Sequence, residues 1–154
     1  MVIRKADIRD IAAINELFYE LDTHEINLQP EHIQRGERPA DYLSEIINGE
    51  RSDFLLAVAD GEIVGFSSIF ARETSNISIL VPCKYAYIQD LVVKEGFRNK
   101  SIGTVLMDES KKWAKQRGMD YLRLSVLPKN NDAQRFYRRN GLCEQMITME
   151  CPLK

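Results

Sequence analysis

A strand-like run, a short cationic loop and a long amphipathic helix follow one another between residues 85 and 117. Residues 85–93 are rich in aromatic and β-branched side chains, which favour a strand. From about residue 101 to 117 apolar residues recur at helical spacing, and Gly118 stands where a left-handed cap ends a helix. This order predicts a strand–helix–strand crossover, and therefore a sheet that is covered by helices.

The rest of the chain adds further elements around this segment. Asp60-Gly61 predicts a tight turn, because both central residues of such a turn need positive φ. The other expected elements are a strand at residues 2–4, helices at 8–21 and from 40 to 48, strands at 54–59 and 63–70, a strand at 121–126, a helix at 131–139 and a last strand at 142–150. Hairpins come first and crossovers later, so the pattern predicts a single α/β (α+β) domain over residues 1–154 with a mixed sheet and helices on both faces.

Composition and charge exclude several classes of protein. Lys and Arg total 21 against 23 Asp and Glu, so the basic excess of a nucleic-acid binder is absent. The longest apolar run, residues 54–59, is far shorter than the roughly 20 residues that cross a bilayer. Only two histidines and no CxxC pair are present, which argues against a metal site. The three cysteines and the charged start without an apolar signal region predict free thiols and a cytoplasmic protein.

The loop before the long helix has the features of a phosphate-binding site. The first amides of a helix lack partners and carry partial positive charge. The small residues Ser101 and Gly103 allow an anion to approach that backbone, and Arg98 and Lys100 add charge. An ordinary turn between a strand and a helix remains an alternative interpretation, since neither a GK[ST] sequence nor a GxGxxG sequence is present.

Two segments carry a resemblance to a known family. Arg98-Asn99-Lys100-Ser101-Ile102-Gly103 resembles the R/Q-x-x-G-x-G/A signature of the GNAT superfamily of N-acetyltransferases, with serine in place of the first glycine. Residues 130–142 are similar to the family's N-x-x-A-x-x-F-Y-x-x-x-G-F segment, with Leu142 for the final phenylalanine. The order of elements fits along essentially the whole chain. The resemblance implies a GNAT-like mixed, mostly antiparallel twisted sheet of six to seven strands with helices on both faces.

The same resemblance implies a reaction. An acetyl group would move from acetyl-CoA to a primary amine of a small molecule, polyamine-like or aminoglycoside-like, or of a peptide. The amine would attack directly in a ternary complex, without an acyl-enzyme and without a metal. The alternative is a non-catalytic module that binds acyl-CoA and acts as a sensor or regulator.

The family's cofactor site maps onto the strand at 85–93 and the loop that follows. The pantetheine arm would lie where this strand splays from the strand at 121–126, pairing with backbone groups of Leu91, Val92 and Val93. A backbone N–H near Val92 would polarise the thioester carbonyl. Asn130 would bond the pantetheine or pyrophosphate region. The pyrophosphate would be bound by Arg98, Asn99, Lys100, Ser101, Ile102, Gly103 and Thr104.

Three residues are candidates for proton transfer. Tyr137 matches the family's acid for the leaving thiolate, although it is also a plausible half-buried helix tyrosine. Strand alternation places Tyr87, Gln89 and Leu91 on one face and Asp90 on the other. Either Tyr87 and Gln89 hold a water that accepts the amine's proton, or Asp90 accepts it if a bulge turns its side chain toward the cleft. Asp90 also has a purely structural alternative, pairing with a neighbouring loop.

Two further segments have expected roles. The acidic loop between the first two helices would attract a cationic amine, or simply be solvated. It contains Glu20, Asp22, His24, Glu25, Glu31 and His32. Residues 146–149 lie on the expected last strand and would form the edge of a homodimer.

Overall fold

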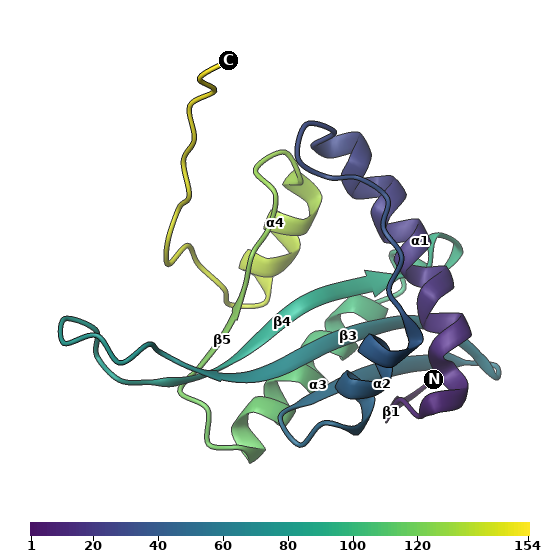
Figure 1. Ribbon diagram of the computed structural model, residues 1–154. Coiled ribbons are helices and arrows are strands. Elements are labelled where there is room, and N and C mark those ends of the chain that lie inside the picture. The colour runs from purple at the N-terminus through teal and green to yellow at the C-terminus, as the bar shows by residue number, and fades with distance from the viewer.

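The computed structural model describes residues 1–154 and contains one five-stranded sheet in the order β1-β2-β3-β4-β5 (Figure 1). The strands are β1 (Val2–Lys5), β2 (Ser52–Ala59), β3 (Glu62–Glu73), β4 (Lys84–Val93) and β5 (Tyr121–Leu124). The first four pair antiparallel, and β5 pairs parallel with β4. The predicted mixed, mostly antiparallel sheet is therefore confirmed.

Helices cover both faces of this sheet, as predicted. They are α1 (Ile11–Leu28), α2 (Ala40–Asn48), α3 (Ile102–Gln116) and α4 (Asn131–Arg139), with short 3₁₀ turns η1 (Ile8–Asp10) and η2 (Glu95–Phe97). In Figure 1, α1 and α2 lie in front of the sheet and α3 lies behind it. No helix of the chain is both long and apolar enough to span a membrane.

Each face of the sheet has its own apolar core. On the α1–α2 face, Phe18, Phe54 and Phe66 meet edge to face or tilted, with ring centroids 4.9–6.3 Å apart. On the α3 face, Trp113 is buried and donates its indole N–H to Asp53 at 2.7 Å. These two cores fix the sheet between its helices and thereby hold β4 in place.

The first helix differs from its predicted bounds at both ends. Asp7 caps the 3₁₀ turn, and Asp10 accepts a bond from the Asp7 amide at 2.8 Å, so the α-helix proper begins later. The helix then continues to Leu28, seven residues beyond the predicted end. The inner side of the helix is apolar up to Leu21 and polar after it. The apolar pattern that predicts a helix therefore ends at Leu21, although the helix continues.

The prediction of a last strand at residues 142–150 is wrong, so the sheet has five strands rather than six to seven. Residues 143–154 make no backbone–backbone hydrogen bond. They run away from the sheet as an extended tail beside α4 (Figure 1). Ion pairs of Glu144 with Arg138 and of Glu150 with His32 tie the tail to the chain's own helical side. The tail makes no backbone pairing with β5, the strand that it would have to join.

Candidate functional site

An opening between β4 and β5 is the first element of the site. The two strands pair only over Tyr85–Ile88 and Tyr121–Leu124. Beyond Ile88, β4 continues to Val93 with β3 on one side and no strand on the other. The backbone of Leu91, Val92 and Val93 therefore borders an open edge inside the sheet, where an extended ligand can add as a strand.

A β-bulge in β4 decides which side chains face this opening. Asp90 lies opposite Ser68 and Ile88 lies opposite Ile69, so Gln89 is the extra residue. The bulge reverses the alternation: Leu91 packs with the α3 core, whereas Asp90 turns to the α1–α2 face that Tyr87 shares. The face predicted for Leu91 is thus wrong, because strict alternation fails at the extra residue.

Asp90 is a partly buried carboxylate with few compensating contacts. The Ser68 hydroxyl donates to its Oδ2 at 3.0 Å, and the Asp90 amide donates to the same hydroxyl. Burial raises the pKa of Asp90, and this outweighs the lowering by the Ser68 hydrogen bond and the nearby Arg38 charge. A carboxylate with a raised pKa is a better proton acceptor than an exposed one.

Glu25 adds a second carboxylate on the same face. It lies on the last turns of α1, not in a loop as predicted, and it is half-buried. Burial raises the pKa of Glu25, and the charges of Asp90 and Asp22 raise it further. Asp22 itself is buried and forms a bidentate pair with Arg38 at 2.5 and 2.8 Å. Asp22 is four residues after Phe18 and Glu25 is four residues after Leu21, so a longer helix would have placed both on its inner side.

Tyr137 on α4 faces these carboxylates from the other side of the opening. Burial and the charges of Glu25 and Asp90 raise the pKa of Tyr137 to about 12. Its ring lies 5.4 Å from that of Phe136, edge to face. The phenol therefore stays protonated across the neutral range. Side chains from α1, β4 and α4 converge here, although they are far apart in sequence.

Tyr87 and Gln89 are already engaged with neighbouring polar groups. The Tyr87 hydroxyl donates to the Ser125 hydroxyl at 3.0 Å, and the Gln89 amide donates to the Tyr42 hydroxyl at 3.2 Å. Ser125 directly follows β5 and Tyr42 lies on α2, so the two side chains form the walls of the opening.

The loop between β4 and α3 has the expected form of an anion site. Asn99 and Ser101 adopt φ of 60° and 63°, which turns the chain sharply into the helix. Val105 donates the first bond of the helix, to the Ser101 carbonyl at 3.1 Å. The three amides before Val105, those of Ile102, Gly103 and Thr104, have no partner in the helix and are free for an anion.

Other residues of this loop have structural contacts as well. Arg98 donates Nε to the Val93 carbonyl at 3.1 Å, and the Lys100 ammonium lies 5.2 Å from the centre of the Phe97 ring. A Cβ on Gly103 would stand 3.3 Å from the ring of Phe136, so its lack of a side chain serves the packing of α3 on α4. Glycine at position 103 is therefore favoured by this packing as well as by the predicted close approach of an anion.

Asn130 begins α4 and is used as its cap. Its side-chain oxygen accepts from the Ala133 amide at 3.2 Å. The amide nitrogen of the same side chain remains available to a ligand. No group of three or more His, Cys, Asp or Glu side chains is arranged to hold a metal ion.

Comparisons with known proteins converge on one family. The model of the acetyltransferase (GNAT) family matches residues 16–142. An aminoalkylphosphonate N-acetyltransferase of Salmonella typhimurium is 29% identical over 139 residues, covering 90% of this chain and 82% of that protein. An uncharacterised N-acetyltransferase of Methanocaldococcus jannaschii is 29% identical over 106 residues, 69% of this chain, and the match spans only 46% of that relative's length.

A solved structure is similar over its full length. A point mutant of a Bacillus halodurans protein superposes with a TM-score of 0.95 at 25% identity, covering 100% of both chains. Sequence and structure comparisons therefore agree on the fold over nearly the whole chain.

Proposed function

Because the chain belongs to the acetyltransferase (GNAT) family, we propose that it is an N-acetyltransferase that moves an acetyl group from acetyl-CoA to a primary amine. The convergence of Asp90 and Tyr137 at the open edge of β4 carries this proposal. A proton acceptor and a proton donor then flank the place where an extended cofactor fits between two strands. Attack is direct, in a ternary complex.

The cofactor would bind along elements that already expose backbone groups. The pantetheine arm pairs with Leu91, Val92 and Val93, and the pyrophosphate binds residues 98–104 at the start of α3. The free nitrogen of Asn130 reaches the same ligand from α4. A backbone N–H near Val92 stabilises the oxyanion of the tetrahedral intermediate.

Asp90 is the group that best accepts the proton of the amine. An alkylammonium has a pKa of about 10.4 and must lose a proton before its nitrogen can attack. The bulge turns Asp90 to the face shared with Tyr87, and burial raises its pKa. Tyr87 and Gln89, engaged with Ser125 and Tyr42, then shape the opening rather than hold a relay water.

Tyr137 supplies the proton for the departing thiolate. Its pKa of about 12 in the free protein is too high for easy transfer to a thiolate whose conjugate acid has a pKa of about 8.5. Most of this elevation comes from burial, and the charges of Glu25 and then Asp90 add to it. When Asp90 takes the proton of the amine, the last of these contributions is removed and the pKa of Tyr137 falls.

The acceptor is a cationic amine of a small molecule or peptide, polyamine-like or aminoglycoside-like. Glu25 and Asp90 place negative charge beside the opening, which attracts an ammonium group. The similar Salmonella enzyme is named for aminoalkylphosphonates, which also carry a primary amine.

A non-catalytic acyl-CoA sensor is the second candidate, because Gln89, on the strand that borders the opening, is an amide and cannot serve as a base. Turnover separates the two. Purified protein is incubated with acetyl-CoA and single amines from a panel of polyamines, aminoglycosides and peptides, and loss of thioester absorbance is followed. A thiol reagent is avoided since Cys143 and Cys151 are exposed. Acetylation of any amine supports the enzyme; saturable acetyl-CoA binding without turnover on the whole panel contradicts it.

We further propose that the protein is a homodimer whose contact involves residues 146–149. These residues lie on the extended tail, with exposed apolar side chains and no backbone partner. The mass of the protein in solution tests this proposal directly.

A further inference from the structure

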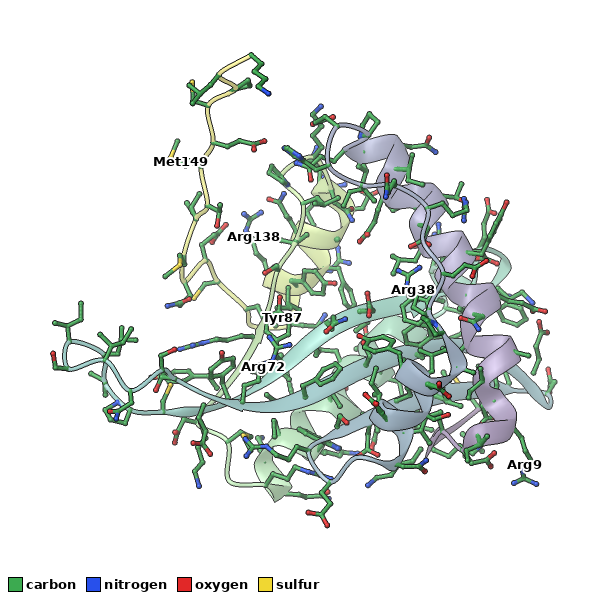
Figure 2. All side chains as sticks on the ribbon, viewed as in Figure 1. Arg9, Arg38, Arg72, Tyr87, Arg138 and Met149 are labelled. Carbon is green, nitrogen blue, oxygen red and sulfur yellow. The ribbon has the colours of Figure 1, made fainter.

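Two arginines lie on the open part of the sheet face next to the candidate site. The Arg72 guanidinium lies 4.3 Å from the centre of the Tyr87 ring, and the two side chains are side by side in Figure 2. The Arg123 guanidinium lies 4.4 Å from the centre of the Tyr85 ring and 5.3 Å from that of Tyr121. Stacking on a ring holds a guanidinium flat and leaves its edge N–H groups open to a ligand.

The register of the strands brings these residues together from three strands. Arg72 on β3 is opposite Tyr85 on β4, and Tyr87 on β4 is opposite Arg123 on β5. Arg72 therefore stacks on Tyr87, which is opposite Arg123, and Arg123 stacks on Tyr85, which is opposite Arg72. Tyr85 and Tyr87 are two residues apart, roughly 7 Å along a strand. The two guanidinium groups are therefore near enough for one anion to approach both.

Neither arginine has a carboxylate partner within the chain. Other partly buried arginines are paired: Arg38 with Asp22 and Arg117 with Asp53. Arg72 forms no ion pair, and the only polar contact of Arg123 is a weak one to the Cys83 sulfur at 3.8 Å. The Nε donor of Arg123 is screened from solvent and has no acceptor. Because Nε is covered by the chain's own atoms, a ligand can reach Arg123 only through its terminal N–H groups, and the unmatched charge of the guanidinium is what favours an anion there.

We propose that Arg72 and Arg123 bind an acidic group of the acceptor, a carboxylate, sulfonate or phosphonate, while its amine reaches Asp90. This inference rests on the proposed acetyl transfer and specifies its substrate class as a zwitterionic amino acid in the broad sense. Negative charge from Asp90 and Glu25 lies beside the opening, and the unpaired positive charge of the two arginines lies on the adjoining part of the sheet, where β4 and β5 pair. Tyr87 and Asp90 are three positions apart along β4, which corresponds to roughly 10 Å at most. A two-carbon chain holds an amine and an acid only about 5 Å apart, so an acceptor of that length requires the side chains of Asp90 and the arginines to cover the remainder.

Matched acceptors test the inference. The rates of acetylation of 2-aminoethylphosphonate, taurine and β-alanine are compared with those of ethanolamine and propylamine, which lack the acid. We expect kcat/KM to be at least about tenfold higher for one of the acidic amines, since hydrogen bonds to charged groups contribute about 1.5–3 kcal/mol. The order among phosphonate, sulfonate and carboxylate identifies the anion. Equal rates for acidic and neutral amines overturn the inference and leave acetyl transfer standing.

Variants then assign the effect to the two arginines. Arg72→Gln and Arg123→Gln each lower kcat/KM for the acidic amine about 10- to 100-fold, mainly through KM, and leave neutral amines nearly unchanged. Arg9→Gln, beside the start of α1 in Figure 2, is the matched control and changes neither. If both arginine variants keep the full preference for acidic amines, the anion binds elsewhere and the inference is wrong.

A binding measurement separates this inference from the proposed function. Calorimetry records the affinity of 2-aminoethylphosphonate, taurine and β-alanine without any turnover. Binding of one of them that Arg72→Gln and Arg123→Gln weaken supports the anion site even if no amine is acetylated. Absence of binding of all three, at concentrations where acetyl-CoA binds, overturns it.

Discussion

Asp90 combines a stability cost with a chemical role. Its carboxylate is partly buried next to other acids, and only the Ser68 hydroxyl donates to it from a side chain. Its pKa in the folded protein lies above the ordinary value, so the ionised form is less favourable when folded than when unfolded. Asp90 therefore destabilises the fold at neutral pH. This cost fades as the pH falls through the raised pKa and is absent below the unfolded value.

Asp90→Asn is accordingly expected to change stability and activity in opposite directions. The neutral amide keeps the shape and removes the buried charge, so Tm rises at pH 7–8, and the gain shrinks toward pH 4. Turnover falls about 10²- to 10⁴-fold, which is the usual contribution of a general base. Thermal unfolding over a pH series and steady-state kinetics provide the measurements.

Asp108→Asn is the matched control for this change, because Asp108 is an exposed carboxylate on α3. It should alter neither turnover nor Tm by a comparable amount. If Asp90→Asn keeps full activity, the base lies elsewhere, and the water route past Tyr87 becomes the better explanation.

Tyr137→Phe tests the other half of the proton transfer. Because the phenol is the proposed acid for the thiolate, kcat falls about 10²- to 10⁴-fold. Affinity for acetyl-CoA remains nearly intact, since the ring and its packing on Phe136 are kept. Equilibrium binding of acetyl-CoA alongside kcat checks this. An equal loss of affinity would make Tyr137 a structural residue.

At the scale of elements, the sequence predicts features that depend on neighbouring residues, such as turns, and does not predict features that depend on contacts between distant elements. The turn at Asp60-Gly61 was predicted from two residues, and both do adopt positive φ. The sequence predicts the bulge at Gln89 only conditionally, because the bulge depends on the register against β3 and not on β4 alone. The last turns of α1 were missed because a helix that faces a polar site carries no apolar stripe there, and Glu25 was therefore assigned to a loop.

The start of α3 is the element on which cofactor binding depends. Ser101→Glu places a carboxylate where the pyrophosphate is expected, so acetyl-CoA binding should be lost. Ser101→Gly is the matched control: the position has φ of 63°, a region that costs a residue with a Cβ roughly 1–2 kcal/mol. Glycine relieves that strain at an entropy cost of about 0.5–1 kcal/mol. Binding should therefore be equal or tighter, with stability unchanged or slightly higher.

Calorimetry with acetyl-CoA and thermal unfolding measure both Ser101 variants. Unchanged binding by a folded Ser101→Glu protein would place the phosphates elsewhere. If Ser101→Gly still binds acetyl-CoA, position 101 tolerates substitution, and the loss of binding in Ser101→Glu is then due to the introduced carboxylate.

At the scale of the molecule, the chain contains two segments that could pair as strands but do not: the outer edge of β5 and the tail at residues 143–154. β5 is an edge strand, and its outer side has no partner. The tail that was predicted to be a strand has an extended backbone without partners. It also exposes most of the surface of Met146, Ile147 and Met149. Such edges invite pairing with another chain. The tail does not pair with β5 of the same chain, so a second copy is a fitting partner for each of the two segments.

Ile147→Asp should therefore convert a dimer into a monomer. Ile147 is 74% exposed in the single chain, so the change leaves folding intact while opposing burial in an interface. Val2→Asp is the matched control: Val2 is 62% exposed and lies on β1, the opposite edge of the sheet. Light scattering should give twice the chain mass of 17.8 kDa for the natural protein and for Val2→Asp, and the single mass for Ile147→Asp. Hydrogen exchange should show tail amides protected only in the dimers. The tail amides have no strand partner within the chain, so protection of these amides requires a second chain. If the natural protein has the single mass, or if it is a dimer whose tail amides are unprotected, the tail does not pair between chains.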